Sequence, residues 1–142
     1  DETARGSALY GAWLCGTVLA GTSMALHHKL CHVLGGSFGL PHAETHTVIL
    51  PHAAAYNAPY ARAAMARVAR ALDAESAPAA LFDLAANAGA PTTLEALGMA
   101  ANDLDRAADI AAASPYPNPR PIERDAIRAL LDDAWHGRQP SG

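Results

Sequence analysis

The sequence predicts an all-α protein, and three observations support this fold class. Apolar residues recur at spacings of three and four along almost every segment, which is the period of an amphipathic helix. No segment shows the strict alternation of apolar and polar residues that a half-buried strand requires. Glycine and proline stand mainly between the periodic segments, where helices end and begin. The 142 residues, 51% of them hydrophobic, are enough for one helical domain with its own core.

The first helix is expected over residues 3–20, with Leu9, Trp13, Leu14 and Val18 on its apolar face. Residues 6–28 carry no formal charge and are numerous enough to span a bilayer. Serine and threonine dilute this stretch, however, and it runs directly into a group of histidines. We therefore expect a buried core helix and no membrane partner.

The next two helices flank a glycine-rich loop. The second is expected over residues 23–34, ending at Gly35-Gly36, since glycine is the usual residue after a helix. The third is expected over residues 43–56, opened by Pro41 in its first turn. Pro51 lies inside this third helix and should kink or split it.

The rest of the chain continues as short helices. They are expected over residues 61–72, 76–89, 93–98, 104–113 and 122–135. Residues 114–121, SPYPNPRP, form a proline-rich turn that is too short to separate two domains. The last helix is amphipathic, and its inward residues should be Ile122, Ile127, Leu130, Leu131 and Trp135.

Composition excludes several classes of function. A net charge of −4 and a single lysine leave no basic face for nucleic acid. Cys15 and Cys31 are expected to be buried free thiols, and with no signal peptide visible the expected compartment is the cytoplasm. No strand–turn–helix carries a GxGxxG or P-loop pattern, so this chain holds no dinucleotide fold of its own.

Five of the seven histidines lie between residues 27 and 46. His28 and His32 are four residues apart on one helix, and His42 and His46 repeat this spacing on the next. Two such helices can direct several imidazoles into one cleft, either to hold a metal or to handle protons without one. His27 and His46 fit a structural role as well as a functional one, whereas His28, His32 and His42 are the favoured functional set.

The region from residue 21 to 57 resembles the signature of the iron-containing alcohol dehydrogenases. The shared elements are His28, His32, Gly35, Pro41-His42, Leu50-Pro51-His52 and Tyr56-Asn57. The segments ALYGAWLCGTVLAG, PHAETHTV and NPRPIERDAIRALLDDAW resemble one branch of that family, the maleylacetate reductases. Where the family commonly has glycine after Pro-His, this chain has Ala43.

The resemblance implies a multi-helix C-terminal domain of the dehydroquinate synthase-like fold. Residues 1–142 would then be a fragment of a homodimeric enzyme whose absent N-terminal domain binds NADH or NADPH. His28 and His42 would match two ligands of a divalent metal, iron or zinc, and His32 would lie near the nicotinamide. The other two metal ligands of the family, an Asp and a His, precede this sequence. The reductase branch does not strictly require a metal.

The resemblance further implies a small dicarboxylate substrate, maleylacetate, reduced to 3-oxoadipate in the degradation of aromatic compounds. His28, His32 and His42 are the expected catalytic residues, and His27, Lys29 and His46 are expected to bind the substrate carboxylates. Two alternatives stay open: a metal-dependent alcohol dehydrogenase of the same family, and a non-enzymatic helical metal-binding module. The sequence PHAETH favours the reductase over the alcohol dehydrogenase.

Overall fold

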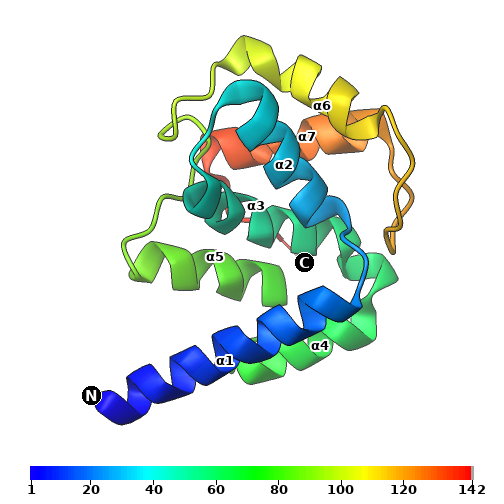
Figure 1. Cartoon of the computed structure of the whole chain (residues 1–142). Helices are drawn as coiled ribbons and strands as arrows, with labels where there is room; N and C mark the ends of the chain where they lie inside the picture. The colour runs from blue at the N-terminus through cyan, green and yellow to red at the C-terminus, as the bar shows by residue number, and fades with distance from the viewer. Residues whose placement is uncertain (142) are drawn as a thin grey trace.

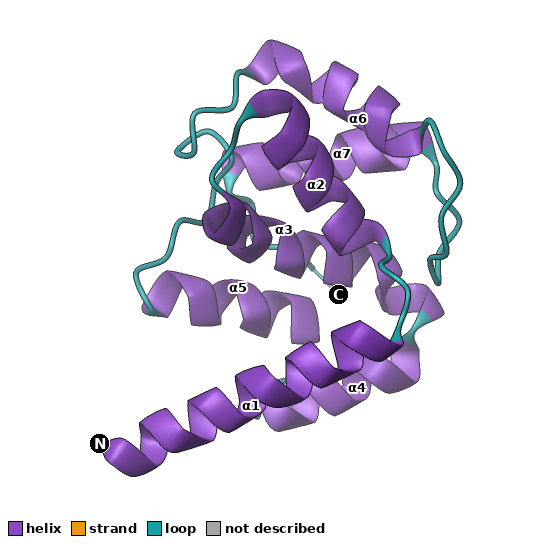
Figure 2. Ribbon diagram, viewed as in Figure 1, coloured by secondary structure: helices purple, strands orange, loops and turns teal. Residues whose placement is uncertain are grey.

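The computed structural model describes residues 1–141, and this part of the chain consists of helices and loops without any strand (Figures 1 and 2). The predicted all-α class is confirmed. The helices are α1 Glu2–Gly21, α2 Leu26–Phe38, α3 His42–Asn57, α4 Arg62–Ala71, α5 Ala77–Asn87, α6 Leu104–Ala112 and α7 Arg124–His136. Two short 3-10 helices, η1 Ala58–Tyr60 and η2 Ala101–Asp103, precede α4 and α6.

Helices α2, α3, α6 and α7 meet in one hydrophobic core. Its most deeply buried large side chains include Leu26, Leu30, Leu34, Val48, Ile49, Leu104, Ile127 and Leu131. Burying one such side chain contributes about 1.5–3 kcal/mol. The inward face predicted for residues 122–135 is confirmed, with Trp135 and Ile122 packed at its edge. The two helices that carry the histidines are therefore anchored at the centre of the molecule.

The end of α2 differs from the prediction. The helix does not end at Gly35-Gly36 but continues to Phe38 and stops at Gly39, whose φ of 70° lies in the left-handed region. The Gly39 amide donates to the Gly35 carbonyl, and the Leu40 amide donates to the Leu34 carbonyl. The left-handed residue that terminates the helix is thus the third glycine, while the first two adopt ordinary helical geometry.

Helix α3 continues through Pro51 as one element, so of the two outcomes expected there, a kink or a split, the split does not occur. At its start, the carbonyl of Pro41 accepts hydrogen bonds from the amide and the hydroxyl of Thr45, the latter at 2.6 Å. Thr45 is fully buried. This local bonding fixes the first turn of α3, which presents His42 and His46.

The short helix predicted over residues 93–98 is not formed. These residues make successive turns in which the Leu94 amide donates to the Ala134 carbonyl of α7, and Gly98 has a φ of 92°. The Leu97 amide donates to the Leu94 carbonyl and the Gly98 amide to the Glu95 carbonyl, and these bonds between residues three apart form turns instead of an α-helix. The segment serves as a connection that docks on α7.

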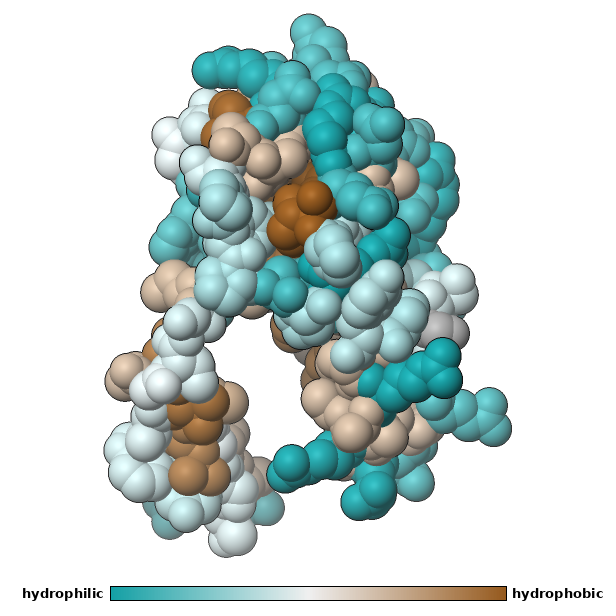
Figure 3. Space-filling model, turned by 90° about the vertical axis from the view of Figure 1, so that its right-hand side faces the viewer, coloured by the Kyte–Doolittle hydropathy of each residue, from teal (hydrophilic) through white to brown (hydrophobic). Residues whose placement is uncertain are grey.

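Helix α1 contradicts the expectation of a buried core helix. None of its residues is buried; Leu9 is 72% exposed and Trp13 is 62% exposed. Figure 3 shows α1 as a lobe that stands apart from the main body and carries apolar side chains. Cys15 on this helix is exposed as well, so only Cys31 is the buried thiol that was predicted.

No single helix in residues 1–141 is both long enough and apolar enough to cross a membrane. Only α1 and α2 taken together have sufficient length and apolar composition, and these two helices meet at an angle of 94°.

Candidate functional site: a histidine cluster between α2 and α3

The structure gathers all five histidines of residues 27–46 into one cluster. The ring of His46 lies at its centre, with its centroid 4.9 Å from that of His27, 5.0 Å from His28 and 4.3 Å from His42. The His28 ring also lies 6.3 Å from the ring of His32. His32 and His42 are exposed, whereas the other three are partly buried. The cluster therefore opens to solvent on the side of His32 and His42.

Burial and mutual repulsion keep the inner imidazoles neutral. Loss of solvent, followed by the charges of the four neighbouring histidines, lowers the pKa of His46 from 6.5 to about 4. The pKa of His27 is also lowered, first by burial; its hydrogen bond to the His46 carbonyl at 3.0 Å opposes this shift, and His28 adds to it. Neutral imidazoles offer a lone pair for a proton, a hydrogen bond or a metal.

An asparagine pair holds the start of α2 in position. No side chain of Ala25 caps this helix; instead Asn118 Oδ1 accepts a hydrogen bond from the Leu26 amide at 3.3 Å. Asn118 also hydrogen bonds to Asn57, the last residue of α3. Beside it, the Tyr56 hydroxyl donates to the Pro121 carbonyl at 2.7 Å. Tyr56 and Asn57 thus tie the end of α3 to the proline-rich loop. Through Asn118 they also fix the start of α2 and orient His27 and His28.

Lys29 is not brought into the cluster. Its ammonium group lies 5.7 Å from the ring centroid of Tyr116, a residue of the proline-rich loop. Residues 27, 28, 31 and 32 share one side of a helix, and residue 29 points away from that side. The structure therefore separates Lys29 from the histidines with which it was expected to form one patch.

Cys31 is the residue of this site that sequence reasoning missed, because it was assigned only to the core. Its side chain is 1% exposed, and burial raises the pKa of its thiol to about 12. Nevertheless, its sulfur and ring nitrogens of His27 and His46 all lie within 4.8 Å of one another. The spacing of His27 and Cys31, four residues apart on α2, was the available signal.

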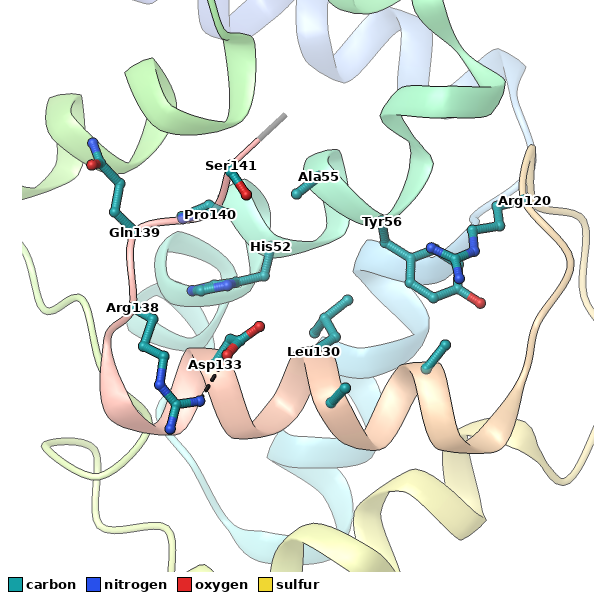
Figure 4. A pocket seen from close by; sticks show the side chains of 12 residues that line it. His52, Ala55, Tyr56, Arg120, Leu130, Asp133, Arg138, Gln139, Pro140 and Ser141 are labelled. Atoms are coloured by element: carbon teal, nitrogen blue, oxygen red, sulfur yellow. Dashed lines mark hydrogen bonds and ion pairs between the residues drawn. The ribbon is translucent and has the colours of Figure 1, made fainter.

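His52 lies outside the histidine cluster. It lines a cavity of about 410 Å³ between α3, the end of α7 and the C-terminal segment, and Figure 4 shows its ring near Asp133 and Arg138. His52 is 3% exposed, and its buried Nε2 atom has no hydrogen-bond partner within residues 1–141. Burial lowers its pKa to about 4, against the opposing charge of Asp133. The ring centroid of Phe82 lies 6.4 Å away.

Comparison with known proteins identifies the family. Residues 1–135 match the Fe-containing alcohol dehydrogenase family, C-terminal. The chain is 63% identical to a maleylacetate reductase of Burkholderia cepacia and 57% identical to one of Pseudomonas knackmussii, each over 141 residues. A solved maleylacetate reductase from Agrobacterium tumefaciens has a TM-score of 0.94 and 56% identity. Each comparison covers 99% of this chain and 40% of the relative, so the chain spans about two fifths of these proteins. The chain belongs to the Fe-containing alcohol dehydrogenase family and corresponds to the C-terminal helical part of its members.

Proposed function

We propose that this chain is the C-terminal helical part of an NADH- or NADPH-dependent maleylacetate reductase. The observation that carries the proposal is the cluster of five imidazoles between α2 and α3, open to solvent at His32 and His42. The named relatives, at 57% and 63% identity, are maleylacetate reductases. Their similarity favours this function over a simple alcohol dehydrogenase or a non-enzymatic metal-binding module.

The reaction needs groups of the kind that the cluster supplies. Hydride addition to a carbon–carbon double bond conjugated to a ketone places negative charge on the ketone oxygen, and hydrogen-bond donors must face that oxygen. We assign this role to His28 and His42. A group with a pKa near the working pH must then protonate the adjacent carbon. His32 is assigned to the nicotinamide side, and His27 and His46 to the substrate carboxylates.

Lys29 is a weaker candidate for carboxylate binding than the histidines, because its ammonium group lies beside Tyr116. A lysine side chain is long and flexible, so its contribution would require movement away from that ring. Substrate binding therefore rests mainly on the imidazoles, and Lys29 serves as a local positive charge behind them.

A divalent iron or zinc ion fits the donor set of His28 and His42 only in part. Both are imidazoles, the commonest metal ligands, and both approach His46 within the same cluster. Two imidazoles are half of a four-coordinate site, and the family resemblance implies that the other two ligands, an Asp and a His, precede this sequence. When bound, such an ion would polarise the ketone oxygen. We favour direct action of the imidazoles, because the cluster supplies more proton-handling groups than a metal site needs.

In this proposal the nucleotide-binding domain lies in the remaining three fifths or so of a relative's length. The uncovered apolar face of α1 supports an extensive contact with other parts of a larger protein. We expect that protein to be a cytoplasmic homodimer. Neither nucleic acid nor a membrane is an expected partner.

The proposal is tested by following the oxidation of NADH and NADPH by the full-length protein in the presence of maleylacetate. Enzyme-like turnover is expected with the full-length protein, and none with residues 1–142 alone, because this chain has no nucleotide-binding fold. Simple primary alcohols with the oxidised cofactors serve as the comparison substrates. A clear preference for the alcohols would replace the proposed function with alcohol oxidation.

A further inference from the structure

Three side chains at the inner side of the histidine cluster form a second group of metal-ligand type. His27 and Cys31 come from adjacent turns of α2, and His46 comes from α3. One ligand atom from each lies within 4.8 Å of the other two. The Nε2 atom of His46 is buried and has no hydrogen-bond partner among the described residues. A buried polar atom without a partner is costly, and a ligand that satisfies it would stabilise the structure.

We propose that His27, Cys31 and His46 bind a divalent ion of the zinc class, at a site separate from His28 and His42. Two imidazoles and one thiolate form a donor set that favours zinc or cobalt over magnesium and calcium, which prefer oxygen ligands. Three protein ligands leave a fourth position for water or for a neighbouring side chain.

Metal binding requires the three ligand atoms to move somewhat closer together. A tetrahedral ion with zinc–sulfur and zinc–nitrogen bonds of ordinary length holds its ligand atoms about 3.3–3.6 Å apart. The three ligand atoms are already within 4.8 Å, so rotation of side chains brings them to that separation. The helices need not move, because α2 and α3 are both anchored in the core.

Binding couples to the loss of a proton from Cys31. The thiol sulfur forms a bond to the ion, and its proton passes to solvent, so no oxidant or reductant takes part. The ion would also link α2 to α3 and satisfy the free nitrogen of His46. The site is argued from the positions of three ligand atoms and does not rest on the proposed reductase activity, although His27 and His46 are also the residues assigned to the substrate carboxylates.

Cobalt(II) is the probe for this site. The full-length protein, reduced and stripped of metal, is titrated with cobalt while its absorption spectrum is recorded. We expect a near-ultraviolet charge-transfer band from thiolate to cobalt, at one ion per chain, that zinc removes by competition. The band should be lost in Cys31→Ala and in His27→Gln, and it should persist in Cys15→Ser, the matched control on exposed α1.

The assignment is overturned by three results: no thiolate band in the unchanged protein, a band that survives in Cys31→Ala, or a band that requires His28 and His42 instead of His46. Circular dichroism checks that each variant is folded. His27 is only partly buried, so His27→Gln provides a test even where removal of the buried Cys31 side chain disturbs the core. Zinc should also raise the melting temperature of the unchanged protein and leave that of Cys31→Ala unaltered.

Discussion

Asn57 and Asn118, 61 residues apart in the sequence, hydrogen bond to each other through both side-chain amides, at 2.7 and 3.2 Å. Asn118 also accepts from the Leu26 amide at the first residue of α2 and donates to the Arg120 carbonyl at 2.7 Å. One amide side chain therefore ties together the end of α3, the start of α2 and the proline-rich loop. The histidine cluster depends on this junction, because His27 and His28 directly follow Leu26.

Replacing Asn118 with alanine should lower the free energy of unfolding by about 1–3 kcal/mol, because it leaves partly buried polar groups without partners. The kcat/KM for maleylacetate should fall at the same time, since the first turn of α2 loses its support. Urea unfolding and steady-state kinetics of the full-length protein measure the two effects. Asn87→Ala, at an exposed position in α5, is the matched control. An equal loss in both variants would mean that the junction does not position the cluster.

The sequence predicts the helices and the gathering of histidines well, because both depend on local spacing. A period of three to four residues determines which residues share a helical face, and His28–His32 and His42–His46 follow it. Loop 39–41 is short enough to keep the two histidine helices adjacent. The structure also bears out the core face of α7, including Ile127 and Leu131.

The features that the sequence does not predict depend on distant contacts. Three glycines, Gly35, Gly36 and Gly39, could each end α2. The helix ends at Gly39, because that is where the backbone adopts the left-handed conformation. Residues 93–98 form turns with hydrogen bonds between residues three apart, and the Leu94 amide docks this segment on α7. Burial of α1 was expected from its composition, but no part of residues 1–141 covers this helix. From the sequence alone Cys31 is an ordinary core residue. Only the packing of α3 on α2 places His46 beside it.

His42→Ala in the full-length protein should lower kcat/KM by about a hundredfold or more, the typical cost of losing one preorganised donor or proton donor. His136→Ala should have little effect. His136 is exposed on α7, where its Nδ1 atom lies 2.9 Å from the carbonyl oxygen and 3.4 Å from Oδ2 of Asp132, away from the histidine cluster. Initial rates with maleylacetate and NADH measure both variants. Small and equal effects would show that the cluster is structural.

Stability should fall as the pH is lowered from about 6.5 to about 4, because the pKa of His46 and that of His52 are each lowered from 6.5 to about 4 in the folded chain. In that window the unfolded chain binds more protons than the folded one, so acid favours unfolding. The contribution of these two histidines to the free energy of unfolding is fully present above pH 6.5. For His52, which is 3% exposed, the loss at the acid end is on the order of 3 kcal/mol.

Urea midpoints recorded across this pH range test the effect, with His52→Leu as the variant. Leucine cannot titrate, so the dependence of unfolding free energy on pH should become shallower. Phe82→Leu is the control, because it removes the aromatic neighbour of His52 but keeps the imidazole. Phe82→Leu should lower the free energy of unfolding by the same amount at every pH and leave its dependence on pH unchanged. An unchanged slope in His52→Leu would show that this histidine does not contribute to acid unfolding.

Trp13→Ala should destabilise the full-length protein by about 3–5 kcal/mol, the cost of removing a buried tryptophan, although Trp13 is 62% exposed in residues 1–141. The reason is that the apolar face of α1 should be covered by the rest of the protein. Ser7→Ala, on the same helix and also exposed, should change stability by no more than about 0.5 kcal/mol. Denaturant unfolding measures the change in the free energy of unfolding for both variants. Similar small changes would show that α1 stays uncovered.

Dialysis of the full-length protein against a strong chelator should leave reductase activity nearly intact. In the favoured mechanism His28 and His42 act on the ketone oxygen directly, and only an ion held by them would make the rate depend on metal. Metal analysis of the same samples is the control, because it shows whether the chelator has removed all bound ions, including any at Cys31. Activity that disappears with the metal and returns with iron or zinc would assign His28 and His42 to a catalytic ion and favour an alcohol dehydrogenase.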